Sequence, residues 1–138
     1  MDLYFSTIYN ENQIPRVEFL TLAQSVEAYH RITVSGKFTL RERLAELAKK
    51  HDNLLKVFIG DAEEFSAAIS ELRNKLTHPN EETANLNKDY RKFLKFSERM
   101  ALLLEVCFLN EIGFNQEQIK EIILNRSKRA NRLHQGWV

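Results

Sequence analysis

Three polar side chains lie within a six-residue stretch near the middle of the chain, at Arg73, Asn74 and His78. An arginine guanidinium is a planar fork of donors that fits a phosphate, and a histidine imidazole gives or takes a proton near neutral pH. Asn74 could orient the imidazole or bind a phosphate oxygen. These groups could cleave RNA, whose own 2′-hydroxyl supplies the nucleophile, so that the reaction needs neither a metal nor a nucleophile from the protein.

The same residues also fit a plain structural interpretation. Arg73 and Asn74 could lie on a solvated helix face, and His78 could be a helix-end residue favoured by the negative end of the helix dipole. Asn74 and His78 are spaced i,i+4, as are Leu72 and Leu76, so the leucines would anchor one side of the helix while the other offers polar groups. Residue types alone leave both interpretations open.

The sequence predicts that helices position these residues. Apolar residues recur at helical spacing over about 15–33, 40–51, 61–77, 85–112 and a stretch after residue 115. Capping boxes are indicated at Thr39 with Glu42, Asp61 with Glu64, and Asn115 with Gln118. A short helical turn is expected near 54–59, and Pro79 stops the helix that carries the motif. The fold class predicted is an all-α bundle of about five helices.

The run of residues 72–79, followed by Glu98-Arg99-Met100 at the start of an apolar stretch, resembles the Apea-like branch of the HEPN superfamily. The resemblance covers roughly residues 15–125, and Arg73-Asn74…His78 matches the R-N-x-x-x-H form of its motif. It implies a HEPN-like helical bundle that forms a homodimer and acts as a metal-independent endoribonuclease in defence or toxin–antitoxin systems. Other members of the superfamily are inactive binding modules.

On this resemblance, Arg73 would hold the scissile phosphate, His78 would transfer a proton, and Asn74 would position one of these groups. Cleavage by 2′-hydroxyl attack needs both an acid and a base. Two motifs facing each other across a homodimer interface would supply two histidines. The alternative is a non-catalytic dimerisation or nucleotide- or RNA-binding module of a larger regulatory protein.

Positive charge gathers in the second half of the chain. Residues 1–84 carry 10 Lys/Arg and 13 Asp/Glu, whereas residues 85–138 carry 10 and 6. Any nucleic-acid surface is therefore expected towards the C-terminal half. The cations nearest the motif in sequence, which are expected to contact an RNA backbone or to lie on a solvated face, are Lys75, Lys88, Arg91, Lys92 and Lys95. The basic tail at 126–138 is interpreted as an arm, a helix extension or an RNA contact.

Two further groups of cations receive a structural interpretation first. His30 and Arg31 end the first helix, where the dipole favours cations, and a second phosphate-contact pair is the alternative. The cluster in and after the second helix, which is interpreted as a solvated face, comprises Arg41, Arg43, Lys49, Lys50 and His51.

Composition points to an ordinary globular protein. The 138 residues include 43% hydrophobic and 28% charged residues, which predicts one domain over 1–138 with a core at about 15–125. The single Cys107 lies in an apolar run and is expected to be a buried, inert thiol. No signal peptide, membrane span, Cys/His metal spacing or cofactor motif is found. We therefore expect a cytoplasmic protein without metal or cofactor, whose partners are RNA, a second copy, and an antitoxin or upstream sensor domain.

Overall fold

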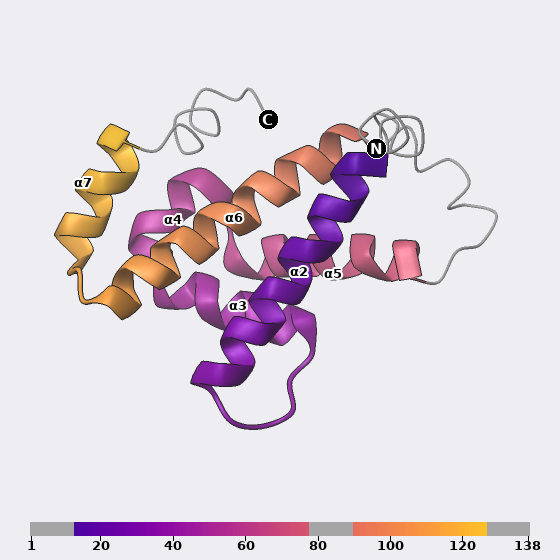
Figure 1. Ribbon diagram of the computed structural model, residues 1–138, viewed down its shortest axis with the longest axis horizontal. Coiled ribbons are helices and arrows are strands. Elements are labelled where there is room, and N and C mark those ends of the chain that lie inside the picture. Colours follow the sequence, from indigo (N-terminus) through magenta and orange to yellow (C-terminus); the bar gives the residue numbers. More distant parts are fainter. Residues whose placement is uncertain (1–12, 78–89, 127–138) are drawn as a thin grey trace, which may run out of the picture.

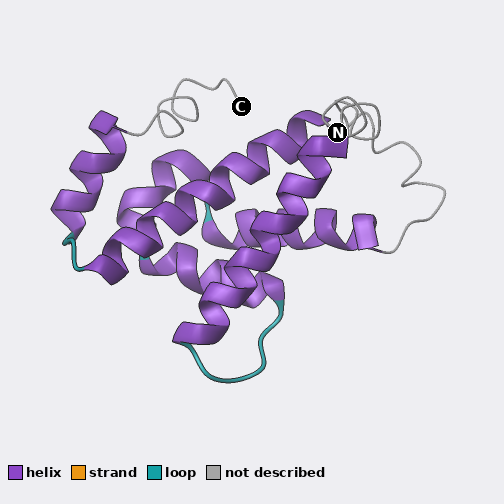
Figure 2. Ribbon diagram, in the orientation of Figure 1, coloured by secondary structure: helices purple, strands orange, loops and turns teal. Residues whose placement is uncertain are grey.

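The computed structural model describes residues 13–77 and 90–126, and within these ranges it contains six helices (Figure 1). Their bounds are α2 Gln13–Thr33, α3 Leu40–Lys50, α4 Asp52–Ile59, α5 Ala62–Thr77, α6 Tyr90–Ile112 and α7 Gln116–Arg126. No strand occurs among these residues (Figure 2). The predicted all-α bundle is confirmed. The expected short turn near 54–59 is wrong in extent, because residues 52–59 form a helix of eight residues.

Helices α2 and α6 run side by side in the same direction. Near their first turns, the rings of Phe19 and Phe93 meet edge to face with centroids 5.5 Å apart. Near their last turns, the rings of Tyr29 and Phe108 do the same at 5.6 Å. Helices α3, α4 and α5 lie behind this pair in Figure 1, and α7 follows at the end of α6. The core fills the space between the two layers.

Helix α6 is buried on several sides, as its apolar second half predicts. The side chains of Met100, Leu102, Leu103, Val106 and Cys107 are at most 1% exposed. The apolar side chains in this part of α6 are therefore largely buried within the bundle itself. The large apolar side chains that remain exposed near the end of α6 are Phe108 and Ile112.

Two of the three predicted capping boxes form both of their hydrogen bonds, and the third forms one of them. Thr39 accepts from the backbone N–H of Glu42 while its own N–H donates to the Glu42 carboxylate, and Asn115 with Gln118 forms the same reciprocal pair. At the start of α5, the Asp61 carboxylate accepts from the N–H of Glu64 at 3.0 Å. These bonds satisfy donors that a helix start leaves unpaired. The start of each of these three helices is therefore encoded locally.

A buried polar cluster surrounds His30 in the last turn of α2. The imidazole is completely buried, with Nε2 2.9 Å from the Glu46 carboxylate and Nδ1 2.9 Å from Nη1 of Arg43. Arg43 is itself 4% exposed, and its Nε donates to the carbonyl of Phe38 at 3.2 Å. His30 therefore lies at the end of the first helix, as expected, but its burial is inconsistent with the alternative of a phosphate contact. Together with Arg43 it fastens the 34–39 loop to α2 and α3.

His51, like Arg43, was expected on a solvated face but is buried. Its side chain is 2% exposed between the end of α3 and the start of α4, and Nδ1 lies 3.4 Å from Nε2 of Gln116. Burial and the nearby Lys50 lower the pKa of this imidazole. The other three cations of the group, at positions 41, 49 and 50, are exposed. The solvated-face interpretation is therefore correct for three of the five residues.

Judged by length and hydropathy, no helix within residues 13–77 and 90–126 could serve as a membrane span.

Candidate functional site

Helix α5 carries the motif and is anchored by its apolar side. Phe65, Ile69 and Leu72 are buried at helical spacing, and the last described turn of the helix ends at Thr77. The hydroxyl of Thr77 donates to the carbonyl of Arg73 at 3.2 Å, which ties the motif turn together. The predicted anchoring by Leu72 is confirmed. The turn that follows it is consequently held in a defined place on the bundle.

Arg73 reaches from α5 to α2. Its Nη1 atom donates to Oε1 of Glu27 at 2.8 Å, and the two side chains are 29% and 24% exposed. A half-buried pair of this kind loses some solvation but keeps two opposite charges in a defined geometry. Arg73 is therefore not an unattached side chain at a helix end. Its guanidinium is oriented by a carboxylate from another helix.

The sequence analysis did not identify Glu27. This residue directly follows Val26, which is fully buried, so helical spacing places it beside the core stripe of α2. That position predicts a side chain at the edge of the core. It does not predict contact with a residue 46 positions later.

The guanidinium of Arg73 retains donors beyond the bond to Glu27. Arginine has five N–H groups in one plane, and a single Nη1 bond leaves the rest of the fork able to meet an anion. Asn74, the next residue, is exposed. An anion that approaches the end of α5 would therefore meet a fixed guanidinium with an exposed carboxamide beside it in the chain.

His78 and Lys88 lie outside the described residues, so their predicted roles stay predictions. Among the residues that are described, no group of three or more His, Cys, Asp and Glu side chains is arranged so that it could hold a metal ion.

Two of the cations that were predicted to contact an RNA backbone line the same hollow. Lys75 from α5 and Lys92 from α6 line one hollow of about 180 Å³ between these helices, and its other walls include Leu72 and Phe96. Lys75 also lies 3.7 Å from the Glu71 carboxylate, one turn earlier on α5. The hollow therefore lies between the motif helix and the basic first half of α6.

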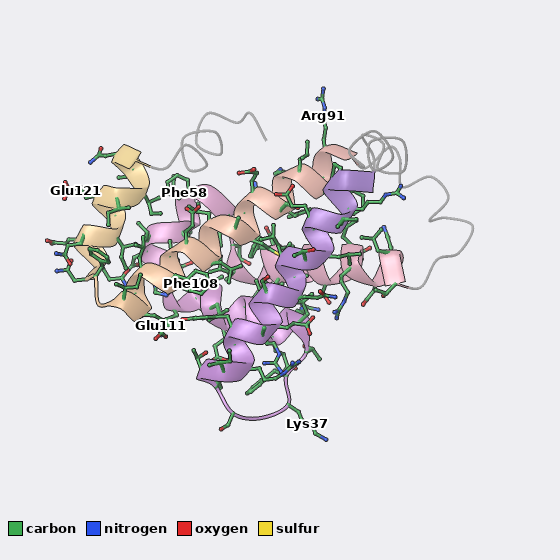
Figure 3. The ribbon with its side chains drawn as sticks, in the orientation of Figure 1. Lys37, Phe58, Arg91, Phe108, Glu111 and Glu121 are labelled. Atoms are coloured by element: carbon green, nitrogen blue, oxygen red, sulfur yellow. The ribbon has the colours of Figure 1, made fainter. Side chains whose placement is uncertain are left out.

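The other two described cations of that group differ in position. Arg91 is exposed and points away from the helices near the start of α6 (Figure 3). Lys95 is half-buried, and its pKa is lowered by the neighbouring positive charge of Arg99 and by burial. Burial also lowers the pKa of Arg99, whose guanidinium lies over the ring of Phe96, 5.8 Å from its centroid. The first half of α6 thus carries more cations than acids.

In a comparison with family models, residues 20–118 match the model described as Apea-like HEPN. The match contains α3, α4, α6 and the motif helix α5 entirely. It also includes both Glu27 and Arg73. Comparisons with curated proteins and with solved structures returned no match.

Proposed function

The chain belongs to the Apea-like HEPN family, and on that premise we propose that it is a metal-independent endoribonuclease. In this proposal Arg73, Asn74 and His78 form the site at the end of α5. The 2′-hydroxyl of the RNA attacks the adjacent phosphorus, the bond to the 5′-oxygen of the next nucleotide breaks, and the product ends in a 2′,3′-cyclic phosphate. The reaction consumes no cofactor.

Each residue has a distinct role in this scheme. Arg73 binds the scissile phosphate and stabilises the negative charge that grows on its oxygens in the transition state. His78 takes the proton from the 2′-hydroxyl or gives one to the leaving oxygen, which is the common role of an imidazole in acid–base catalysis. Asn74 hydrogen-bonds to the phosphate or to the imidazole.

The observation that carries the proposal is the pairing of Arg73 with Glu27. Electrostatic catalysis depends on donors that are already oriented before the transition state forms, because reorientation during the reaction costs free energy. The Glu27 carboxylate holds one edge of the guanidinium at 2.8 Å and leaves the rest of the fork unbound by that contact. Glu27 is therefore a positioning residue in the proposed site.

A single copy of the motif supplies one histidine, whereas the reaction requires an acid and a base. The proposal therefore includes a homodimer in which two α5 ends face each other across a two-fold axis. Such an RNA-cleaving dimer would act in the cytoplasm as part of a defence or toxin system, controlled by an antitoxin or by a sensor domain.

Cleavage of single-stranded RNA by the full chain tests the proposal. Wild-type protein should release products with a 2′,3′-cyclic phosphate in the presence of EDTA, and His78→Ala should abolish their release. RNA with 2′-O-methyl groups at every position, and DNA of the same sequence, should both resist. Equal cleavage of DNA would contradict the mechanism, since DNA lacks the attacking hydroxyl.

The same ion pair also favours a second candidate function. If Arg73 serves only to join α5 to α2 through Glu27, the motif is a structural device in a non-catalytic dimerisation or RNA-binding module. In that case no RNA is cleaved by wild-type protein, and both Arg73→Ala and Glu27→Ala lower the thermal midpoint by similar amounts. Cleavage by wild-type protein that these substitutions reduce by far more than the loss of stability explains supports the enzyme instead.

A further inference from the structure

The hollow between α5 and α6 has the features of a nucleotide subsite. At about 180 Å³ it is smaller than the roughly 300 Å³ at which pockets for drug-sized ligands begin, so one base suits it better than a larger molecule. Phe96 contributes an aromatic wall, and Lys75 and Lys92 contribute cations to the lining. An aromatic ring beside cations is the combination that binds single-stranded nucleic acids without sequence preference.

The part of α6 that borders this hollow carries more cations than acids. Lys95 and Arg99 are one turn apart on α6, and like charges at this spacing repel each other. Among the described residues, the Nε atom of Arg99 is buried without a hydrogen-bond partner. The acid that lines the hollow, Glu71, is 72% exposed and lies 3.7 Å from Lys75. A phosphate near Lys92 would be attracted by the net positive charge of this part of α6.

The position of the hollow relative to the motif follows from helix geometry. Around α5, Arg73 lies about 100° from Leu72 in one direction and Lys75 about 60° in the other. Arg73 faces α2, where Glu27 holds it, and Lys75 faces α6 at the hollow. The two features therefore flank the same turn of α5, separated by about the width of a helix, roughly 10–12 Å. A strand that places one phosphate at Arg73 can reach the hollow with a flanking nucleotide.

We propose that this hollow binds one nucleotide of single-stranded RNA next to the cleavage point, with the base against Phe96 and the backbone phosphate contacted by Lys75 and Lys92. The assignment rests on the proposed ribonuclease function for its reference to a cleavage point. RNA binding at the hollow does not depend on catalysis and can be measured separately.

The test uses the full chain and a fluorescent single-stranded RNA with 2′-O-methyl groups at every position, which the proposed chemistry cannot cleave. Binding is measured by fluorescence anisotropy over a range of salt concentrations. Phe96→Leu keeps an apolar side chain against the core but removes the ring, so its affinity should fall by roughly tenfold with an unchanged salt dependence. Lys92→Ala removes a phosphate contact, so the slope of log K against log salt should decrease by about 0.7.

Matched controls separate these effects from general changes. Phe108→Leu makes the same substitution at a half-exposed ring near the other end of α6, and Lys37→Ala removes one charge from the 34–39 loop (Figure 3). Both controls should bind RNA as the wild type does. Phe96→Tyr retains the ring and should also bind normally, which guards against the possibility that Phe96→Leu only perturbs the fold. An oligonucleotide whose sugars carry no bases should bind wild type and Phe96→Leu equally.

The outcomes separate the subsite from the catalytic proposal. If Phe96→Leu binds like Phe108→Leu, or Phe96→Tyr loses binding, the base contact is wrong. If Lys92→Ala keeps the salt slope of Lys37→Ala, the phosphate contact is wrong. If the variants behave as expected but wild-type protein cleaves no unmodified RNA, the subsite stands and the ribonuclease function is rejected.

Discussion

The Nη1 atom of Arg73 lies 2.8 Å from the Oε1 atom of Glu27, although the two residues are 46 positions apart in the chain. The bond joins the motif helix α5 to α2 and places an acid beside the proposed phosphate-binding arginine. It also changes what a substitution at Arg73 tests. A side chain at a helix end usually contributes little to core packing, whereas removal of this half-buried ion pair should cost on the order of 1 kcal/mol.

Glu27→Ala should therefore impair catalysis without removing any residue of the motif. We expect kcat for RNA cleavage to fall by roughly tenfold, about 1.4 kcal/mol in the barrier, because the guanidinium is no longer oriented. KM should change little. Glu27→Gln retains an acceptor for Arg73 and should recover part of the loss. Glu18→Ala, at an exposed position on the same helix, is the control; equal kcat values for Glu18→Ala and Glu27→Ala would mean that the ion pair is structural only.

The proposed dimer can be tested by cysteine cross-linking at the ends of two helices. Thr77 is exposed at the end of α5 beside the motif, and Ile112 is 73% exposed at the end of α6. If two motifs face each other, Thr77→Cys should form a disulfide-linked dimer under mild oxidation and Ile112→Cys should not. The native Cys107 is 1% exposed and should not interfere. Efficient linkage through position 112 with none through 77 would reject a composite site at the α5 ends.

The buried cluster around His30 should contribute to stability and not to RNA binding. His30→Ala leaves the buried Arg43 without its imidazole partner, so we expect the free energy of unfolding to fall by about 2–4 kcal/mol. Arg31→Ala, at the exposed neighbouring position, should change it by less than about 0.5 kcal/mol. Urea unfolding measures both values. A strong loss of RNA affinity in His30→Ala at unchanged stability would revive the phosphate-contact interpretation.

Alkaline pH should destabilise the protein through Cys107. Burial raises the pKa of this thiol from 9.0 to about 12, so the folded state keeps its proton at pH values where the unfolded chain has lost it. The stability contribution is complete below pH 9 and is lost as the pH rises towards 12, by up to about 1.4 kcal/mol per pH unit. Thermal midpoints of wild type and Cys107→Ala, compared at pH 7.5 and 10.5, should show a smaller decrease in the variant.

Part of the alkaline decrease should persist in Cys107→Ala. Burial and the hydrogen bond to Glu111 raise the pKa of Tyr29 as well, so this phenol also favours folding less as the pH rises beyond its ordinary range. Tyr29→Phe keeps the ring against Phe108 and removes that hydroxyl. The double variant combines Cys107→Ala with Tyr29→Phe. If its thermal midpoint falls with rising pH as much as that of the wild type, neither group governs the alkaline loss of stability.

The helices and their starting points were predictable from the sequence because they depend on residues three or four positions apart. The Thr39 and Asn115 caps each form with a side chain three residues later, and the buried side of α5 repeats at the helical period through Phe65, Ile69 and Leu72. Such interactions are settled within a turn or two of helix. The motif at Arg73 was recognised for the same reason, since its spacing is local.

The surroundings of the motif were decided by the tertiary structure. Which edge of α2 faces α5, and which edge of α5 faces α6, depends on how whole helices cross. Helical spacing therefore could not indicate that Glu27 would meet Arg73 or that Phe96 would line a hollow with Lys75. Burial of His30 likewise requires α3 to present Arg43 and Glu46 to it. The sequence alone determined the helices and the reactive residue types, whereas packing between distant helices determined which charges were paired, buried or left for a ligand.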